Sequence, residues 1–533
     1  MKDHYDYIIV GAGAAGCILA NRLTASGRHS VLLLEAGDEG RSIWIPIPAG
    51  FGKLITDPRY NWLFQTEPED MTRGRKIAVP RGKGLGGSTL INGMIYVRGQ
   101  AADYDRWAAL GAEGWGWADV APQFRKLECY PKGDSSRGHD GPMHVHEVTE
   151  RYVLSDALLA AAQEAGHALN PDYNGPIQDG FGYYQVLQHR GRRWSVVDGY
   201  LKPARSRANL HVLANAHVLK ADIDGGRCVG VTYRRGNQTH QARAGEVIMA
   251  AGAIQTPQIL ELSGIGRPDV LQDAGIAVRH ALQGLGENYI DHYCARMDWR
   301  VKGALSVNQQ RYGWRLALAV AQYFARRTGI LTLGTGLAFG FVKSRPDLPS
   351  ADVQYFFMNA SYANQVAREL EHPPGMTLAI SQMRPESRGS IHIRSANPDD
   401  PPAIHPNYLA STADQDSLIG GMQVARNIMA QPAMARYVDH EKNPGQDVQG
   451  REQWLDYVRQ VGQTIYHPIG TCRMGTDATA VVDPRLRMHG LPGLRVADAS
   501  VMPSMVSGNI QGAVMMVAEK ASEMILEDAR QAG

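Results

Sequence analysis

The sequence has few cysteines, and none lies in a pattern that binds a metal. Its five cysteines are spread over 533 residues, without a Cys-x-x-Cys pair or a Cys/His group at zinc-ligand spacing. This argues against a disulfide framework and predicts no metal centre. Free thiols fit a reducing compartment, so we expect a cytoplasmic protein. The first residues also lack the basic, apolar and small-residue pattern of a secretory signal.

The chain has almost no net charge and no long apolar run. Lysine and arginine number 55 against 53 aspartate and glutamate, so the overall charge gives no reason to expect nucleic acid as a partner. The longest apolar helical candidate, residues 316–325, contains Gln322 and falls short of the about 20 residues that span a bilayer. We therefore expect no integral membrane segment, and peripheral contact with an inner membrane stays open. Nothing in the sequence indicates an oligomeric state.

Internal repeats are absent as well, which argues against a solenoid or a propeller. Hydrophobic residues make up 44% of the chain and charged residues 20%, as in a typical soluble globular protein. A single hydrophobic core usually stops growing near about 250 to 300 residues. The length therefore predicts two joined domains.

The N-terminal segment has the pattern of a βαβ unit that binds a nucleotide. Residues 5–10 are a β-branched run, a glycine turn follows, and the next apolar residues recur at helical spacing. In such a turn Gly11 permits the tight bend, Gly13 lets the backbone approach a pyrophosphate, and Gly16 lets the helix pack on the strand. Val31–Leu34 reads as a second buried strand. Glu35 at its end is placed to accept hydrogen bonds from ribose hydroxyls.

The rest of the chain predicts a second domain inserted into the first. Residues 41–75 read as an excursion over the sheet that could act as a lid, residues 100–127 read as helical, and residues 130–190 read as turns and irregular loops. Short strands then alternate with amphipathic helices before a last strand and a long C-terminal helix. We predict a nucleotide-binding domain from residues 1–130, 190–290 and 460–533, and an α+β substrate-binding domain from residues 131–189 and 291–459.

The glycine turn alone does not decide between NAD and FAD, because both cofactors share the ADP half. A single fingerprint in a chain of this length favours a tightly held flavin, since no second Gly-x-Gly-x-x-Gly is present for a nicotinamide. Other segments point the same way. Residues 82–98 (GKGLGGSTLINGMIYVR) and 252–266 (GAIQTPQILELSGIG) resemble the two signatures of the glucose-methanol-choline (GMC) oxidoreductases, and the resemblance covers nearly the whole chain.

The resemblance implies the GMC fold, in which a Rossmann-like FAD-binding domain joins an α+β substrate-binding domain. It also implies the cofactor contacts, with residues 92–95 beside the isoalloxazine, Val218 near the adenine, and Asp498 and Ala499 at the ribityl and pyrophosphate end. Together with the fingerprint, the expected FAD-binding residues are Gly11, Gly13, Ala14, Ala15, Gly16, Glu35, Ala36, Gly84, Gly87, Ser88, Asn92, Gly93, Met94, Ile95, Val218, Asp498 and Ala499.

Two departures from the family pattern matter. Some members attach the flavin through a histidine just before the asparagine that matches Asn92, and here that position is Ile91, which has no nucleophile. We therefore expect non-covalent FAD. Residues 284–292 (GLGENYIDH) have Tyr289 and Ile290 where the family often shows Leu-Gln, so no contact is transferred to that segment.

Alcohol oxidation needs a base that takes the hydroxyl proton as hydride leaves the carbon, and a neutral imidazole suits that work. The resemblance makes His467 the base and Asn509 the partner whose amide would donate to the developing alkoxide. Asn509 could instead cap the C-terminal helix. Cys472 has no adjacent activating base and is expected to pack as a small apolar side chain. Tyr466, Trp62 and aromatic residues within 354–362 are expected either to line the pocket or to pack in the core.

The predicted function is therefore FAD-dependent oxidation of an alcohol, above all a primary one, to the aldehyde or ketone. Oxygen as acceptor would make the enzyme an oxidase, whereas a quinone or an electron-transfer protein would make it a dehydrogenase. The main alternative is a lyase of the same fold, because relatives that cleave hydroxynitriles retain FAD without redox use. A flavin-holding protein without turnover and a decarboxylating photoenzyme are more distant alternatives.

Overall fold

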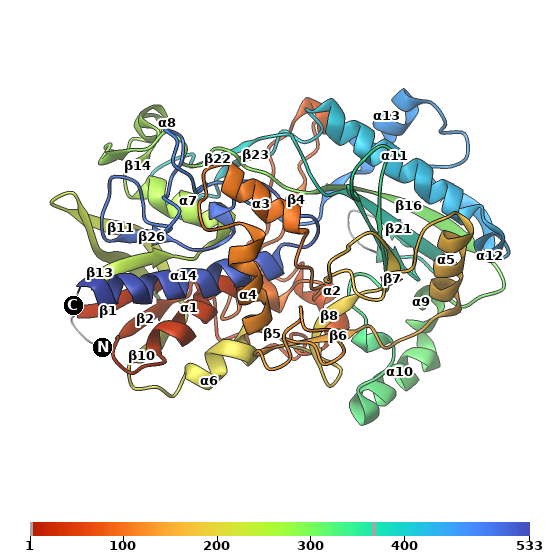
Figure 1. The fold of residues 1–533 in the computed structure, drawn as a ribbon, viewed down its shortest axis with the longest axis horizontal. Helices are drawn as coiled ribbons and strands as arrows, with labels where there is room; N and C mark the ends of the chain where they lie inside the picture. Colours follow the sequence, from red (N-terminus) through yellow and green to blue (C-terminus); the bar gives the residue numbers. More distant parts are fainter. Residues whose placement is uncertain (1–3, 365–368, 533) are drawn as a thin grey trace.

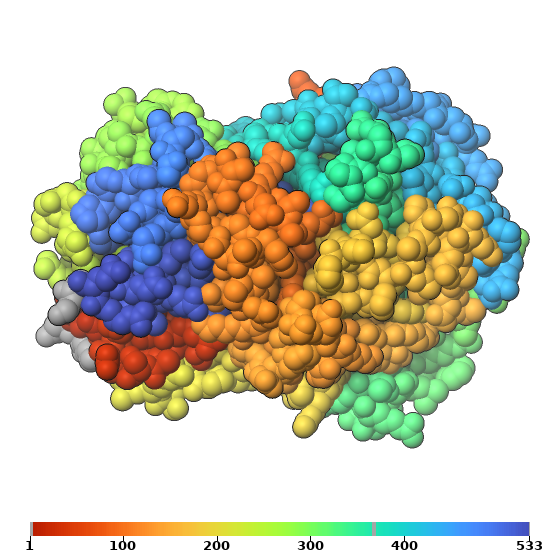
Figure 2. Space-filling view, in the orientation of Figure 1, coloured from red at the N-terminus to blue at the C-terminus, as the bar shows by residue number. Residues whose placement is uncertain are grey.

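The computed structural model describes residues 4–364 and 369–532, which form two large sheets joined by the chain that crosses between them (Figure 1). The C-terminal helix packs along α1 beside the sheet that contains the N-terminal strand, so the first and last described elements lie on the same side of the molecule. Figure 2 shows the segment that carries α3 and α4 lying across the front, between the two halves.

The first sheet has seven strands, of which six run in one direction and β12 runs against its two neighbours, β11 and β13. Across the sheet the order is β10 (Leu210–Leu213), β2 (Val31–Leu34), β1 (His4–Val10), β13 (Gln238–Met249), β12 (Arg227–Arg235) and β11 (Ala216–Asp224), with β26 (Leu494–Val496) pairing the end of β13. The predicted βαβ unit is confirmed, because β1 and β2 pair in parallel and α1 (Ala14–Thr24) connects them. All four residues of β2 are buried, as a strand covered on both faces requires.

The second sheet also has seven strands and is antiparallel throughout. Across it lie β24 (Val438–Asn443), β16 (Tyr293–Val301), β21 (Gly375–Gln382), β18 (Val353–Met358), β17 (Ala338–Val342) and β7 (Gly180–Tyr183), with β25 (Gln463–Thr464) pairing the start of β16. Strand β25 belongs to this sheet although the sequence assigned its residues to the nucleotide-binding domain. The division into two discontinuous domains itself stays a prediction. The predicted α/β class is confirmed.

The region 130–190 is more regular than its composition indicated, so the prediction of irregular loops there was wrong. A four-stranded sheet forms from β5 (Glu128–Cys129), β6 (Met143–Glu147), β8 (Gln185–His189) and β9 (Arg192–Arg193). Helix α5 (Val153–Glu164) lies between β6 and β7 and buries its apolar side, including Leu158. The composition is rich in glycine and proline because these residues lie at the ends of the elements. The strands between them are short and pair with strands that are distant in sequence, so the local pattern does not reveal them.

Four two-stranded ribbons complete the strands. They are β3 (Phe64–Gln65) with β4 (Ala78–Val79), β14 (Ile265–Gly266) with β15 (His280–Ala281), β19 (Tyr362–Asn364) with β20 (Glu369–Leu370), and β22 (Ser390–His392) with β23 (Ala403–His405). Residues 41–75, expected to be an excursion, contain only short elements such as η1 (Pro48–Gly50), α2 (Phe51–Leu54) and η2 (Asp70–Thr72).

Helices cover both sheets (Figure 1). Helix α14 (Gln511–Ala532) packs along α1 by the first sheet, and α11 (Thr412–Met429) packs on β21 of the second. The remaining α-helices are α3 (Ala101–Ala109), α4 (Trp117–Leu127), α6 (Lys202–Ala204), α7 (Gly252–Leu262), α8 (Pro268–Asp273), α9 (Val307–Gln310), α10 (Gly313–Arg326), α12 (Pro432–Ala435) and α13 (Arg451–Val461). Shorter turns of helix are η3 (Gly87–Leu90), η4 (Val197–Leu201), η5 (Ile330–Thr332) and η6 (Ala499–Val501).

The predicted helical candidate at residues 316–325 is part of α10, which protrudes from the molecule. Trp314, Leu318 and Phe324 on this helix are 70%, 58% and 60% exposed. Throughout residues 4–364 and 369–532, the helices fall short of the length and apolar character that crossing a membrane requires.

Candidate active site

One cavity of about 290 Å³ is lined by residues of both large sheets. The predicted fingerprint and signature residues border one part of it, and residues of β16, β18 and β21 border another. Of the residues predicted to form the site, those that line the cavity are Gly11, Gly13, Ala14, Ala15, Glu35, Ala36, Gly87, Ser88, Asn92, Gly93, Met94, Ile95, Val218, His467, Asp498, Ala499 and Asn509. Gly16 and Gly84 are the two that do not line it.

The glycine turn before α1 presents backbone to the cavity. Gly11 has φ +98°, and a Cβ atom added there would lie 2.6 Å from the carbonyl oxygen of Ala250. A Cβ on Gly13 would meet no atom within 4 Å, since this residue faces the open cavity. No side chain caps the start of α1, so the first N–H groups of the helix are available to an anion.

The two glycines that do not line the cavity act by packing. A Cβ on Gly16 would lie 1.9 Å from the carbonyl oxygen of Gly11, so only glycine lets α1 sit this close to the turn. The N–H of Gly84 donates to Oε1 of Glu35 at 3.1 Å.

Gly87 has φ +52° and approaches the turn so closely that a Cβ there would lie 2.8 Å from Cα of Gly13.

Glu35 is held at the end of β2 by backbone donors. Its Oε2 accepts from the N–H of Ala12 and its Oε1 accepts from the N–H of Gly37, both at 2.9 Å. Burial raises the pKa of this carboxyl, and the three backbone hydrogen bonds oppose that shift. Carboxylate oxygens have further lone pairs, so Glu35 can still accept from a ribose hydroxyl at the cavity wall.

Asp498 joins two segments at the same end of the cavity, its own turn and the start of α7. Its Oδ2 accepts from the N–H of Gly252 at 2.8 Å and from Oγ1 of Thr256 at 2.7 Å, at the start of α7. Its Oδ1 accepts from the N–H and hydroxyl of Ser500. The carboxylate therefore positions the turn that carries Ala499.

Hydrogen bonds from neighbouring segments hold residues 92–95 in place. The side-chain amide of Asn92 donates to Gln511, and its Oδ1 accepts from Nη1 of the buried Arg193 at 2.7 Å. Met94 has φ +64°, and its carbonyl accepts from the N–H of Leu187 in β8 at 2.8 Å. These contacts fix a backbone edge along the cavity wall.

His467 lies in the loop just after β25, and the residue is 8% exposed. Its N–H donates to Oδ1 of Asp291 at 2.8 Å, while Oδ2 of Asp291 accepts from the hydroxyl of Thr464 at 2.5 Å. Gly470 at φ +87° and Pro468 shape the loop that presents the imidazole to the cavity, as the sequence predicted. Burial, and then the neighbouring His292 and Arg81, hold the pKa of His467 well below its ordinary value.

A second imidazole sets the proton position on His467. Nδ1 of His292 lies 3.0 Å from Nδ1 of His467, and Nε2 of His292 lies 3.0 Å from the carbonyl oxygen of Met383. A carbonyl only accepts, so Nε2 of His292 carries a proton. Burial lowers the pKa of His292 to about 4, which leaves its Nδ1 bare. Nδ1 of His467 therefore donates to His292, and its Nε2 carries the lone pair of the ring.

Asn509 faces that lone pair. Its Nδ2 lies 3.3 Å from Nε2 of His467, and its Oδ1 accepts from Nε2 of Gln354 at 3.0 Å. The donor from Gln354 determines which way the amide points. Helix α14 begins only at Gln511, and the side-chain contacts of Asn509 run to His467 and Gln354, which does not favour the helix-cap alternative.

Several of the other residues predicted for the pocket line the same cavity. Trp62 and Tyr466 line the cavity, as do Phe356, Met358 and Tyr362 from the predicted aromatic segment. Two arginines, Arg81 and Arg296, also line it. Cys472 is fully buried in the main hydrophobic core and burial raises the pKa of its thiol far above the ordinary value, in keeping with a packing role.

Sequence reasoning missed three residues that contact the predicted base or its partner. Asp291 and His292 lie in the segment 284–292, from which no contact was transferred, and Gln354 lies within the stretch considered only for its aromatic residues. The adjacent acid and imidazole at 291–292 were a signal, since such pairs orient catalytic histidines. Their distance of 175 residues from His467 hid the connection.

Comparison with known proteins places the chain among flavoenzymes. Residues 5–294 and 385–518 match two family models, both described as GMC oxidoreductase. The chain is 39% identical over 528 residues to an "Alcohol dehydrogenase [acceptor]" of Pseudomonas putida, covering 98% of this chain and 96% of the relative. It is 40% identical over 538 residues to the mitochondrial choline dehydrogenase of Homo sapiens, covering 98% and 90%.

Solved structures share the fold over the full length. Pyridoxine 4-oxidase from Mesorbium loti has a TM-score of 0.89 with 27% identity, covering 98% of this chain and 99% of that one. A formate oxidase variant from Aspergillus oryzae has a TM-score of 0.91 with 25% identity, covering 100% of both chains. The predicted fold is confirmed by these likenesses.

Proposed function

The chain belongs to the GMC oxidoreductase family, and on that premise we propose how its residues carry out the FAD-dependent oxidation of an alcohol. The protein is an oxidoreductase that acts on the CH–OH group of donors. The observation that carries the proposal is the hydrogen-bonded chain from Met383 through His292 to His467, which leaves one imidazole lone pair facing the cavity.

The residues around the cavity fit FAD. The uncapped start of α1 and the open space at Gly13 suit a diphosphate, and the buried carboxylate of Glu35 suits ribose hydroxyls. We assign the adenine to the wall at Val218 and the flavin ring to the wall at residues 92–95. When bound, FAD accepts the hydride that leaves the carbinol carbon.

The protein's part in the reaction is to remove a proton and to hold the oxygen that remains. Nε2 of His467 takes the proton from the substrate hydroxyl, because it carries the lone pair at the cavity and the low pKa keeps the ring neutral at neutral pH. Nδ1–H of His467 continues to donate to His292 as positive charge develops on the ring. Nδ2 of Asn509 donates to the substrate oxygen, and Gln354 keeps the amide in that orientation.

We further propose that the flavin is held without a covalent bond. The residue that precedes Asn92 is Ile91, which lines the cavity with an alkyl side chain. Acid precipitation should therefore release the yellow cofactor into the supernatant, and colour retained in the pellet would contradict this assignment.

The lyase alternative has less support than oxidation. Relatives and structural neighbours of the chain are named as dehydrogenases and oxidases. Anaerobic mixing with alcohols separates the two, because an oxidoreductase bleaches its flavin and a lyase does not. The variant His467→Ala should remain folded and yellow, while its reduction by alcohol slows by roughly 100- to 10,000-fold. Normal reduction by this variant would contradict the assignment of the base.

We propose a quinone as the electron acceptor, reached at a lipid surface. Helix α10 exposes Trp314, Leu318 and Phe324, and residues 299–346 contain no aspartate or glutamate. Arg311, Arg315, Arg326 and Arg327 lie within or beside this helix. A helix with exposed apolar side chains and only basic charges suits the interface of an anionic bilayer.

Co-sedimentation with anionic vesicles tests the acceptor proposal. The wild-type holoenzyme should sediment with them, whereas a variant with Trp314→Ser and Phe324→Ser should stay in solution and keep its reduction by alcohol. Equal partition of the two proteins, or reoxidation by oxygen faster than by quinone, would contradict the proposal.

A further inference from the structure

The wall of the cavity next to His467 is positively charged. Arg296 of β16 and Arg81 both line it, and Arg296 is 7% exposed. Among the lining residues only Glu35 and Asp498 are carboxylates, and both are held by backbone N–H groups at the nucleotide end. The cavity therefore places two guanidinium groups and no carboxylate where the substrate binds.

The pairing of the strands places Arg296 beside apolar side chains that line the cavity. Arg296 pairs with Ala379 in β21, and Ala379 pairs with Phe356 in β18, so the three residues form one row across the sheet. All three line the cavity. Arg296 thus lies in the part of the cavity formed by the second sheet.

The guanidinium of Arg296 has more N–H donors than it has hydrogen-bond acceptors among the described residues. Among residues 4–364 and 369–532, its one hydrogen-bond acceptor is Oε1 of Gln463, at 2.9 Å from Nη1, and it has no salt bridge. Asp298 lies two residues along the strand, but its carboxylate accepts from Thr377 and Asn443. The charge of Asp298 favours the buried guanidinium, but no carboxylate of the described residues accepts a hydrogen bond from it, which suggests that a ligand carboxylate fills that place.

We propose that the substrate is an alcohol that carries a carboxylate away from its reacting carbon, and that Arg296 binds this carboxylate. The inference rests on the proposed function and narrows its substrate class. A quaternary ammonium alcohol fits poorly, because Arg81 and the buried Arg296 would repel it and no acidic side chain among the described lining residues of this part of the cavity offsets them. Guanidinium instead matches a carboxylate through two parallel N–H donors.

Anaerobic flavin reduction of the holoenzyme by a series of ω-hydroxy acids, by hexanol and by choline tests this inference. We expect the highest kcat/KM for a hydroxy acid and the lowest for choline. The variant Arg296→Met should lose roughly 30-fold or more in kcat/KM for the hydroxy acid and little for hexanol. Arg296→Lys should retain part of the preference, and Arg300→Met serves as the matched control on the same strand, since Arg300 pairs with Glu371 outside the cavity.

The outcomes separate this inference from the function itself. A kcat/KM for choline or hexanol that equals or exceeds that for every hydroxy acid overturns the substrate class alone. An unchanged preference in Arg296→Met also overturns it. Absence of flavin reduction by all of the alcohols overturns the proposed function, and the inference with it.

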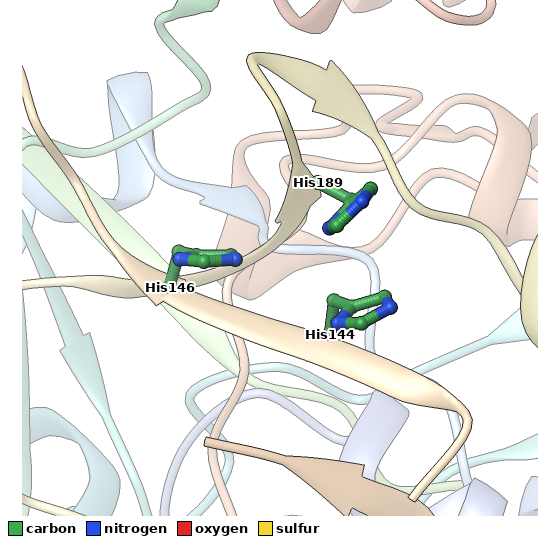
Figure 3. A group of neighbouring side chains, drawn as sticks. All are labelled: His144, His146 and His189. Atoms are coloured by element: carbon green, nitrogen blue, oxygen red, sulfur yellow. The ribbon is translucent and has the colours of Figure 1, made fainter. Parts of the chain in front are cut away.

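A separate observation points to a metal site away from this cavity. His144 and His146 of β6 and His189 of β8 turn their rings toward one another (Figure 3). One nitrogen from each ring can be chosen so that all three lie within 4.8 Å of one another. Nδ1 of His189 is buried and has no hydrogen-bond partner among the described residues.

The donor set suits a borderline transition metal. Tetrahedral zinc with Zn–N bonds of about 2.0 to 2.1 Å needs nitrogens about 3.4 Å apart, so the rings of His144 and His189, which stack at a centroid distance of 4.1 Å, would turn out of the stack on binding. Three neutral imidazoles favour Zn²⁺, Co²⁺ or Ni²⁺ over Mg²⁺, which prefers oxygen. The exposed His146 leaves a route for the ion and a fourth position for water.

We infer that His144, His146 and His189 bind one Zn²⁺-like ion, which ties β6 to the end of β8. Strand β8 supports the flavin wall, because Leu187 donates to the carbonyl of Met94 and Gln188 donates to the carbonyl of Thr332. A metal here therefore stabilises the structure behind residues 92–95. Zinc-ligand spacing along the sequence does not reveal the site, because β-strand pairing brings His189 to the other two.

Metal binding to untagged, chelator-treated holoenzyme tests this inference. Wild type should bind one Zn²⁺ or Co²⁺ per chain after dialysis, should show the visible absorption of tetrahedral Co²⁺, and should gain thermal stability with Zn²⁺ but not with Mg²⁺. The variants His146→Ala and His189→Gln should lose all three responses, whereas His440→Ala, at an exposed histidine elsewhere, should keep them. Substoichiometric binding by wild type, or equal binding by His146→Ala, would overturn the site.

Discussion

The Nδ1 atoms of His292 and His467 lie 3.0 Å apart, with the two rings edge to face at 78°. This contact joins the residue just before β16 to the loop that carries the proposed base. Nε2 of His292 donates to the carbonyl of Met383, so Nδ1 of His292 carries no proton. In the contact between the two rings, Nδ1–H of His467 is therefore the donor and Nδ1 of His292 is the acceptor. His292 is thus a positioning residue that selects the tautomer of the base.

Replacing His292 by leucine should impair the base without removing it. The variant leaves Nδ1–H of His467 without an acceptor, so the ring no longer favours the tautomer with a bare Nε2. We expect anaerobic flavin reduction to slow by roughly 10- to 100-fold, the range for groups that orient another side chain. His292→Asn, whose amide oxygen can accept, should recover part of the rate. Equal rates in His292→Leu and wild type would exclude the tautomer role.

The pH dependence of reduction should reflect the low pKa of the base. Burial, His292 and Arg81 all disfavour the imidazolium form of His467, so the ring stays neutral well below pH 6.5. The kcat/KM for flavin reduction should therefore stay flat from about pH 8 to pH 6 and fall only in more acid solution. In Arg81→Met the acid limb should move to higher pH, because one lowering charge is gone. A wild-type limb centred near 6.5 would contradict this expectation.

Gln354 should matter through the amide of Asn509. Its Nε2 donates to Oδ1 of Asn509, which turns Nδ2 toward His467. Glutamate at position 354 cannot donate when ionised, so the amide should turn and present its oxygen to the base. We expect Gln354→Glu to lower kcat for reduction by roughly tenfold or more, with KM changed less. A change confined to KM would place Gln354 in substrate binding instead.

Gly87→Ala should weaken both folding and cofactor retention. The added Cβ would lie 2.8 Å from Cα of Gly13, and φ +52° is unfavourable for alanine. We expect a loss of about 1 to 3 kcal/mol in the free energy of unfolding and a lower FAD content after dialysis. Gly52→Ala is the matched control, because a Cβ there meets no atom within 4 Å. Thermal unfolding and the flavin-to-protein absorbance ratio measure both effects.

Local patterns in the sequence were sufficient to predict the βαβ unit. Residues 5–10, the glycine turn and Val31–Leu34 are contiguous, and each depends on the conformations and apolar spacing of neighbouring residues. Residues 130–190 were misjudged for the converse reason. Strand β6 is stable only because β8 pairs with it from about forty residues away, and short strands of that kind leave little local trace.

The sequence by itself determined the nucleotide turn, because the strand, the glycines and the helix form one contiguous pattern, and its resemblance to the GMC oxidoreductases supplied the histidine and asparagine proposed for the chemistry. Only the tertiary structure decided what surrounds that histidine. Arg296 reaches the cavity through the register of the second sheet, while His292 and Gln354 contact His467 and Asn509 from behind the cavity wall. Hydrogen bonds and charge act over a few ångströms in space, whatever the separation along the chain.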